Sequence, residues 1–193
     1  MRSLAEYEDL AAVAHGHLCA GQILGLRLAL HGMELLGIED PAGNDRKRLV
    51  TYVEIDRCAT DAITVVTGCR LGKRALKFRD FGKMAATFCD LKEDRAVRVS
   101  ALESSKQRAK EMYPDICNKN EQQMRAYREI PANELFDSQW VRVSIAPEEF
   151  PGYKGVRRAC AECGEGINFE RFTERDGQTL CLACAGARYY TPL

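Results

Sequence analysis

The sequence has no net charge, only three histidines, and no apolar run near the roughly 20 residues of a membrane span. Its 28 basic and 28 acidic residues are interspersed, so we expect neither nucleic acid nor an acidic membrane as a partner. We expect no signal peptide, because residues 1–4 run directly into an acidic helical pattern. These absences favour a cytoplasmic protein that does not enter the membrane.

Cysteine, by contrast, is abundant, with nine residues among 193. A cytosolic chain uses cysteine for metal binding and thiol chemistry rather than for disulfides. Four of the nine form two Cys-x-x-Cys pairs near the C-terminus, and the other five are scattered. The length is enough for one well-packed domain and a small appendage.

The densest group of reactive side chains lies in residues 15–21, where His15, His17 and Cys19 alternate with other residues. Glycines in this stretch relax the backbone, so the three side chains can converge. Imidazole and thiolate bind zinc and other late transition metals, and they also serve as base and nucleophile. The alternative is a helix-capping histidine, a locally bonded histidine and a buried cysteine. We favour a functional site, and we leave out His31, which falls on the polar stripe of a helix.

A second candidate lies in a helix predicted over residues 56–68, with Asp56 as its cap and Gly68 at its end. Cys58 lies in the first turn, where the helix dipole and unpaired amides stabilise a thiolate. We therefore expect its thiol to have a low pKa, although a buried core cysteine is the alternative. Asp61 follows one turn later, so both side chains share one face of the helix.

The pattern of apolar and turn residues predicts an α+β core domain of mixed helices and a largely antiparallel sheet over residues 1–146. A linker rich in Pro and Gly follows over 147–157. Helices are predicted at 4–14 (capped by Ser3 with Glu6), 20–37, 103–112 and 119–129, and strands at 49–55, 76–80, 83–90, 95–102 and 138–145.

The last segment, residues 158–193, carries the two cysteine pairs. Seventeen residues separate the pairs, and four thiolates at this spacing complete a closed tetrahedral shell around one Zn²⁺. The sequence predicts a treble-clef zinc finger with a hairpin turn at 176–177, in which the zinc is structural or shapes a docking surface. The predicted zinc ligands are Cys160, Cys163, Cys181 and Cys184.

These motifs together resemble the FmdE family of formylmethanofuran dehydrogenase proteins over roughly residues 10–105. The matching stretches are His15-Gly16-His17-Leu18-Cys19 with Gly21 and Gly25, Cys58-Ala59-Thr60-Asp61-Ala62-Ile63, Thr67-Gly68-Cys69, Leu71-Gly72-Lys73 and Asp80-Phe81-Gly82-Lys83-Met84-Ala85. This chain has Ala20 where the family usually has proline, and Arg70 where it usually has threonine. Arg70 adds a charge near the candidate site.

The resemblance implies an α+β core, often dimeric and sometimes followed by a treble-clef finger. It also implies a core site of His17, Cys19 and Cys58, with His15 as a weaker fourth member and Asp61 nearby. A metal held by such a set keeps an open position, as catalytic metals do. Zn²⁺ or another transition metal is therefore expected in the core as well as in the finger.

Two functions follow from this resemblance. The first is an accessory or redox-partner subunit linked to a molybdenum or tungsten formylmethanofuran dehydrogenase-type, methanogenesis-related system. The chain would then form a homodimer and associate with a larger oxidoreductase complex. The second is a stand-alone metal-dependent enzyme that acts on a small molecule through His17, Cys19 and Cys58, with Asp61 assisting. The sequence identifies no substrate, and the absence of a glycine-rich nucleotide loop favours the first function.

Overall fold

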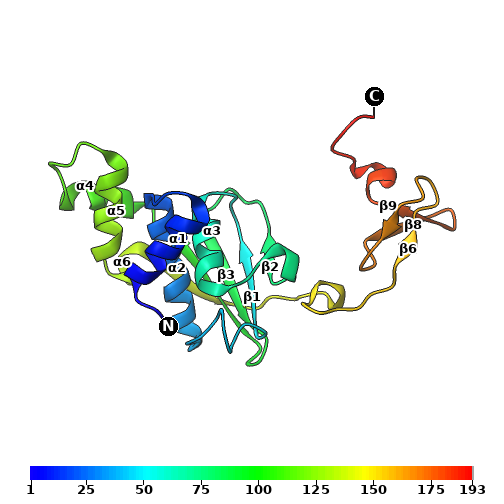
Figure 1. The fold of residues 1–193 in the computed structure, drawn as a ribbon, viewed down its shortest axis with the longest axis horizontal. Coiled ribbons are helices and arrows are strands. Elements are labelled where there is room, and N and C mark those ends of the chain that lie inside the picture. The colour runs from blue at the N-terminus through cyan, green and yellow to red at the C-terminus, as the bar shows by residue number, and fades with distance from the viewer. Residues whose placement is uncertain (193) are drawn as a thin grey trace. The chain divides into compact units, whose positions relative to one another are not determined.

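The computed structural model describes residues 1–192, and the chain separates into two compact units, Met1–Val143 and Ser144–Leu193. The first unit combines helices with one five-stranded sheet, which confirms the predicted α+β class (Figure 1). Its elements are α1 (Leu4–His15), α2 (Ala20–Leu36), β1 (Leu49–Val53), α3 (Cys58–Thr67), η1 (Leu71–Lys73), β2 (Leu76–Phe78), β3 (Ala85–Asp90), β4 (Arg95–Ala101), α4 (Ser104–Met112), α5 (Lys119–Glu129), α6 (Ala132–Leu135) and β5 (Phe136–Val141).

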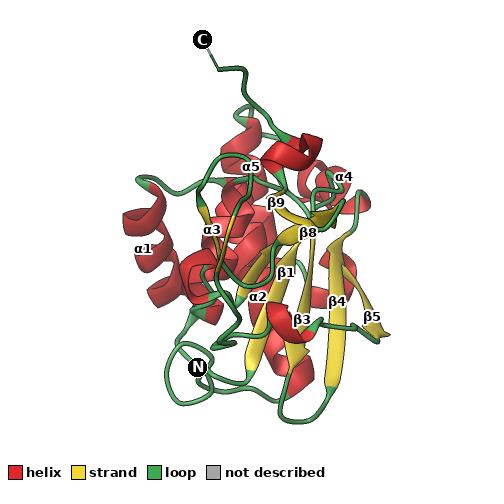
Figure 2. Cartoon of the chain, turned by 90° about the vertical axis from the view of Figure 1, so that its right-hand side faces the viewer, coloured by secondary structure: helices red, strands yellow, loops and turns green. Residues whose placement is uncertain are grey.

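The sheet has the strand order β2-β1-β3-β4-β5, and all of its neighbouring pairs are antiparallel except β1 with β2. In Figure 2, α2 lies behind the sheet, where it packs against β3 and β4. The strand predicted over residues 138–145 is β5. It begins two residues earlier than predicted, at Phe136, and ends at Val141 instead of residue 145. β5 begins at Phe136 because the short helix α6 ends directly before it.

Two glycines of α2 allow the close packing that its apolar surface requires. A Cβ atom on Gly25 would lie 2.6 Å from the carbonyl oxygen of Ala59 on α3, and a Cβ on Gly32 would overlap the ring of Phe88. Most of α2 is buried as a result, as its apolar composition predicts. The close approach brings the N-terminal ends of α2 and α3 together, and this positions the candidate site.

The structure confirms two of the predicted helix-capping features and corrects a third. Ser3 and Glu6 form the predicted capping box of α1, and Gly68 ends α3 in the left-handed conformation with φ of 66°. The predicted cap of α3 was wrong. Arg57, not Asp56, is the N-cap residue, and no side chain caps this helix.

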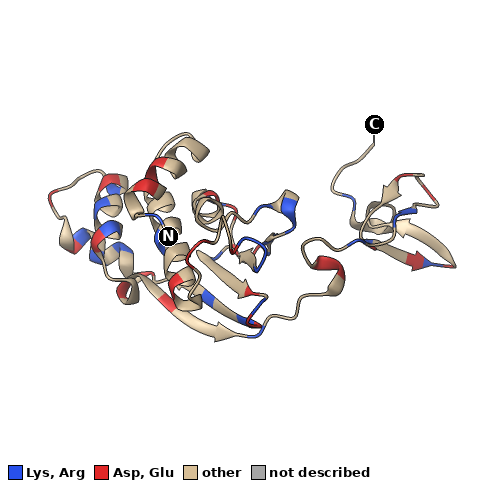
Figure 3. Cartoon of the chain, turned by 60° about the horizontal axis from the view of Figure 1, so that its bottom comes forward, with Lys and Arg blue, Asp and Glu red and all other residues tan. Residues whose placement is uncertain are grey.

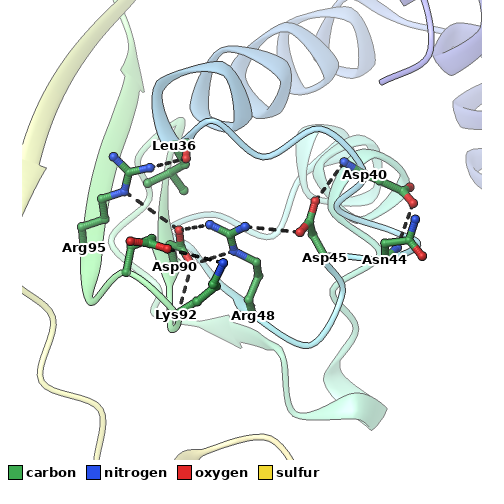
Figure 4. Close-up of polar contacts among 9 residues, drawn as sticks. Leu36, Asp40, Asn44, Asp45, Arg48, Asp90, Lys92 and Arg95 are labelled. Carbon is green, nitrogen blue, oxygen red and sulfur yellow. Dashed lines mark hydrogen bonds and ion pairs between the residues drawn. The ribbon is translucent and has the colours of Figure 1, made fainter.

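A buried carboxylate connects the end of α2 to the sheet (Figure 4). Arg48 binds Asp90 through two hydrogen bonds, of 2.9 Å from Nε and 2.5 Å from Nη2. The backbone amide of Lys92 also donates to Asp90, and Arg95 donates to the carbonyl of Leu36. Burial opposes ionisation of Asp90, but these hydrogen bonds outweigh it, so the pKa of Asp90 lies below its usual range.

We expect Asp90→Asn to lower the free energy of unfolding by about 3 kcal/mol, because it removes the buried carboxylate that Arg48 binds through two hydrogen bonds and leaves only the more distant Asp45 as an ionic partner of Arg48. Urea denaturation at neutral pH measures this loss. Since the folded-state pKa is lowered, the ionic contribution is present above the unfolded value near 3.8 and is lost as the pH falls through the folded value. The difference between wild type and variant should therefore shrink below about pH 4. A difference that is constant with pH would contradict this account.

The second unit is built from two short hairpins and short helical segments. Its elements are η2 (Pro147–Glu149), β6 (Arg158–Ala159), β7 (Gly166–Ile167), β8 (Phe172–Arg175), β9 (Gln178–Cys181) and η3 (Ala183–Ala187). Asp176 and Gly177 form the predicted turn between β8 and β9, both with positive φ, at 51° and 74°. The buried core of this unit consists of Cys160, Ile167 and Leu180.

Acidic and basic residues are interspersed along α4 and α5, whereas α1 carries Glu6, Glu8 and Asp9 and no Lys or Arg (Figure 3). Within residues 1–192, no helix combines the length and the apolar character needed to cross a bilayer.

Candidate metal sites

The first candidate site forms where α1 ends and α2 begins. Gly16 ends α1 in the left-handed conformation, with φ of 90°, and the chain turns back toward α2. One ligand atom each of His15, His17 and Cys19 then lies within 4.8 Å of the others. The two imidazole rings are 4.9 Å apart, centroid to centroid. The structure thus brings together the three side chains that the sequence singled out in this loop.

The thiol of Cys19 is not used to cap its helix. Cys19 is the N-cap residue of α2, yet its side chain makes no capping hydrogen bond. Asn120 on α5 instead accepts a hydrogen bond of 2.9 Å from the amide of Ala20, at the first turn of α2. A cysteine at this position is therefore available for metal binding.

Cys58, the first residue of α3, lies beside this group. A Cβ atom on Gly21 would lie 3.3 Å from Cβ of Cys58 and 3.8 Å from Sγ of Cys19, so both cysteines flank this glycine. Among the described residues, the set of ligand atoms within 4.8 Å contains His15, His17 and Cys19 and leaves Cys58 out. A role of Cys58 as a ligand stays a prediction.

The expected low pKa of Cys58 was wrong for the metal-free site. Burial raises the pKa of the Cys58 thiol, and the neighbouring Cys19 thiol raises it further. The nearby Arg57 charge acts in the opposite direction but does not outweigh these causes. The helix position alone therefore does not make this thiol a thiolate.

Asp61 contacts His15 and not a cysteine. Oδ2 of Asp61 is 2.7 Å from Nδ1 of His15, across 46 residues of sequence. The side chain of His15 is 19% exposed and that of Asp61 is 56% exposed. His15 is thus the most firmly held imidazole of the group, although the sequence ranked it below His17.

Sequence reasoning missed two supporting residues of this site, Gln22 and Asn120. Gln22 is fully buried, and its Nε2 donates a hydrogen bond of 2.8 Å to the carbonyl of Cys58. It therefore ties the first turn of α2 to the first turn of α3. The sequence did offer a signal for Gln22. It is a polar residue one turn after Cys19 on an otherwise apolar helix, and a glutamine on a buried helix face is rare.

His31 lies outside this group, as predicted. Its Nε2 is 3.1 Å from the hydroxyl of Ser138, and its ring stacks against Phe136 at 6.0 Å. These contacts join α2 to β5, and they give His31 a structural role.

The second site is the four-cysteine cluster of the C-terminal unit. Ligand atoms of all four side chains lie within 4.8 Å of one another, and Sγ of Cys163 is 3.9 Å from Sγ of Cys181. Two thiolates bound at about 2.3 Å around a tetrahedral zinc are separated by about 3.8 Å. The donor set and the spacing therefore fit one zinc ion. The cluster consists of Cys160, Cys163, Cys181 and Cys184.

Backbone amides around the cluster favour thiolates. The amide of Cys181 lies 3.3 Å from Sγ of Cys160, and the amide of Cys184 lies 3.4 Å from Sγ of Cys181. Hydrogen bonds from the amides of Cys163 and then Cys181 lower the pKa of the Cys160 thiol to about 6. The neighbouring Cys181 thiol and burial raise the pKa of the Cys184 thiol, and the pKa of the Cys163 thiol is also raised, by burial and the Cys160 thiol. Cys160 is thus the thiol of this cluster that most readily becomes a thiolate, and metal binding must displace the protons of Cys163 and Cys184.

The fold and the four-cysteine cluster define a metal-binding α+β protein with a C-terminal finger. Residues 14–137 match the model of the family described as "FmdE, Molybdenum formylmethanofuran dehydrogenase operon", and the chain belongs to this family. Residues 153–190 match the "Prokaryotic dksA/traR C4-type zinc finger". The resemblance seen in the sequence motifs is confirmed, and the chain is an FmdE-like metal-binding protein with a C4-type zinc finger.

Two relatives extend this comparison. The chain is 31% identical over 196 residues to a protein of Archaeoglobus fulgidus named "Probable S-adenosyl-L-methionine-binding protein". The match covers 91% of this chain and 51% of that protein, so the chain spans about half the length of this curated relative. A tungsten formylmethanofuran dehydrogenase FmdE-like protein from Syntrophus aciditrophicus, solved at 1.90 Å, shares the fold. Its TM-score is 0.66 at 18% identity, with 98% of this chain and 96% of that chain covered.

Proposed function

We propose that the protein is an accessory or redox-partner subunit that binds two metal ions, one in the finger and one in the core. The observation that carries this proposal is the convergence of His15, His17 and Cys19 within 4.8 Å at the junction of α1 and α2. Two imidazoles and one thiolate suit Zn²⁺ or another late transition metal. Cys58, which flanks the same glycine as Cys19, would be the fourth ligand.

The two metals would have different roles. Four thiolates in the finger form a closed shell, so the Zn²⁺ on Cys160, Cys163, Cys181 and Cys184 would be structural or would shape a docking surface. The core group is more open, because His17 is exposed to solvent. A position on the core metal would then remain accessible to an exchangeable group, as in catalytic or electron-transfer sites.

The proposed partner is a molybdenum or tungsten formylmethanofuran dehydrogenase-type complex of a methanogenesis-related system. The family description and the name of the Syntrophus protein support this link. We further propose a cytoplasmic homodimer on the basis of family membership alone, because the apolar residues of α2 are already buried within the single chain. Light scattering should then give twice the chain mass of 21.6 kDa at micromolar concentration, and a single chain mass would contradict the dimer.

The second candidate function is a stand-alone metal-dependent enzyme that acts on a small molecule. The exposed position of His17 and the name of the Archaeoglobus relative, which refers to S-adenosyl-L-methionine, favour this candidate. His17, Cys19 and Cys58 would then be the catalytic group, with Asp61 assisting. Calorimetry with S-adenosyl-L-methionine separates the candidates, since binding that is lost in Cys19→Ser would support the enzyme.

Native mass spectrometry tests the two-metal proposal. The full chain, purified with zinc, should carry two ions, and Cys19→Ser should carry one, because the core loses its sulfur ligand. Cys117→Ser is the matched control, since Cys117 is exposed and lies outside both clusters. This control should keep two ions. One ion in the wild type, or two in Cys19→Ser, would contradict the core site.

A further inference from the structure

Asp61 makes a short side-chain contact with His15 of the core group. The carboxylate is carried by the first turn of α3, and the imidazole is the last residue of α1. The 2.7 Å separation joins Oδ2 of Asp61 to Nδ1 of His15. With Nδ1 engaged, Nε2 is the remaining ring nitrogen of His15 that can bind an ion.

We propose that Asp61 is a positioning residue that holds His15 in the Nδ1–H tautomer, with Nε2 directed to the core metal. This inference rests on the proposed core metal site and assigns the residue that orients one of its ligands. A carboxylate behind a histidine fixes the ring orientation and makes the opposite nitrogen a stronger ligand. The metal set would then include His15, His17 and Cys19, with Asp61 behind His15.

The structure also argues against Asp61 as a direct ligand. Among the described residues, the core group of ligand atoms that lie within 4.8 Å of one another contains no carboxylate oxygen. Oδ2 of Asp61 is already taken by His15. Asp61 has one further effect, because a negative charge in the first turn of α3 favours the helix. That effect on helix stability does not depend on His15, so an experiment that reads out His15 can distinguish it from the positioning role.

The experiment compares Asp61→Ala and Asp61→Glu with Asp56→Ala in the full chain. Asp56 is an exposed carboxylate just before α3, so its loss reproduces the change of charge near the helix start. Zn²⁺ affinity of the second, weaker site is measured by competition with a chromophoric chelator. The tautomer of His15 is measured by ¹⁵N NMR of the chain with zinc in the finger and none in the core.

Asp61→Ala should weaken the second zinc site by about 10- to 100-fold and should shift His15 away from the Nδ1–H tautomer. Asp61→Glu should restore part of both, and Asp56→Ala should change neither. Unchanged affinity and tautomer in Asp61→Ala would overturn the positioning role while leaving the metal site intact. If the wild type binds no second zinc, the proposed function fails. In that case, the tautomer still tests the Asp61–His15 link. An Nδ1–H tautomer that is present in the wild type and lost in Asp61→Ala supports the link, and the same tautomer in both proteins overturns it.

Discussion

Cys160→Ser will lose the finger zinc and unfold the C-terminal unit while the first unit stays folded. Four-thiolate zinc binding contributes about 10–16 kcal/mol to folding in modules of this kind. Among the residues of this unit that the structure describes, the buried core has three side chains, Cys160, Ile167 and Leu180, which is too small to replace that contribution. The first unit has its own extensive core around α2, so it does not depend on the finger metal.

Measurements of zinc content and limited proteolysis test this prediction. Zinc should fall by one ion per chain, and protease should remove the segment after Val143 much faster than in the wild type. Cys181→Ser should behave in the same way, whereas Cys117→Ser should match the wild type. A Cys160→Ser variant with unaltered zinc content would show that the four cysteines do not share one ion.

The second large effect concerns alkylation of the core cysteines. In the chain without core metal, iodoacetamide should modify Cys19, and added Zn²⁺ should slow this reaction at least about tenfold, because a metal-bound thiolate is a poor nucleophile toward it. His17→Ala should abolish most of this protection, since one of the imidazole ligands is lost. Mass spectrometry of the digested protein gives the rate for each cysteine.

Cys117 provides the internal reference for this experiment, and Cys58 shows whether it is the fourth ligand. Burial raises the pKa of the Cys58 thiol, so Cys58 should react slowly without metal, and zinc should slow it further if it is a ligand. Cys117 is exposed, and it should react at the same rate with and without zinc. Equal alkylation rates of Cys19 with and without zinc would show that Cys19 is an ordinary half-buried thiol and not a metal ligand.

The sequence predicted those parts of the fold that depend on local patterns. The capping box of Ser3 and Glu6, the apolar helix α2 and the Asp176-Gly177 turn all follow from nearby residues. The alternating strands predicted a mainly antiparallel sheet, but the parallel pairing of β1 with β2 depends on how α3 crosses between them. A pattern within one strand does not carry that information.

The candidate site was predicted as a set of residue types and not as a geometry. His15, His17 and Cys19 are close in sequence, so their convergence could be expected. The contact of Asp61 with His15 joins residues 46 positions apart, and it depends on the packing of α1 against α3. The start of α2 packs against the start of α3 and places Cys19 beside Cys58; partial burial and this neighbouring thiol raise the pKa of Cys58, which the helix dipole alone did not predict.

X-ray absorption at the zinc edge of Cys160→Ser tests the central claim most directly. In this variant the finger site is broken, so the bound zinc reports on the core. We predict a mixed shell of two imidazole nitrogens at about 2.0–2.1 Å and one or two sulfurs at about 2.3 Å. A shell of oxygen and nitrogen without sulfur, or a variant that binds no zinc, would contradict a core metal site built on His15, His17 and Cys19.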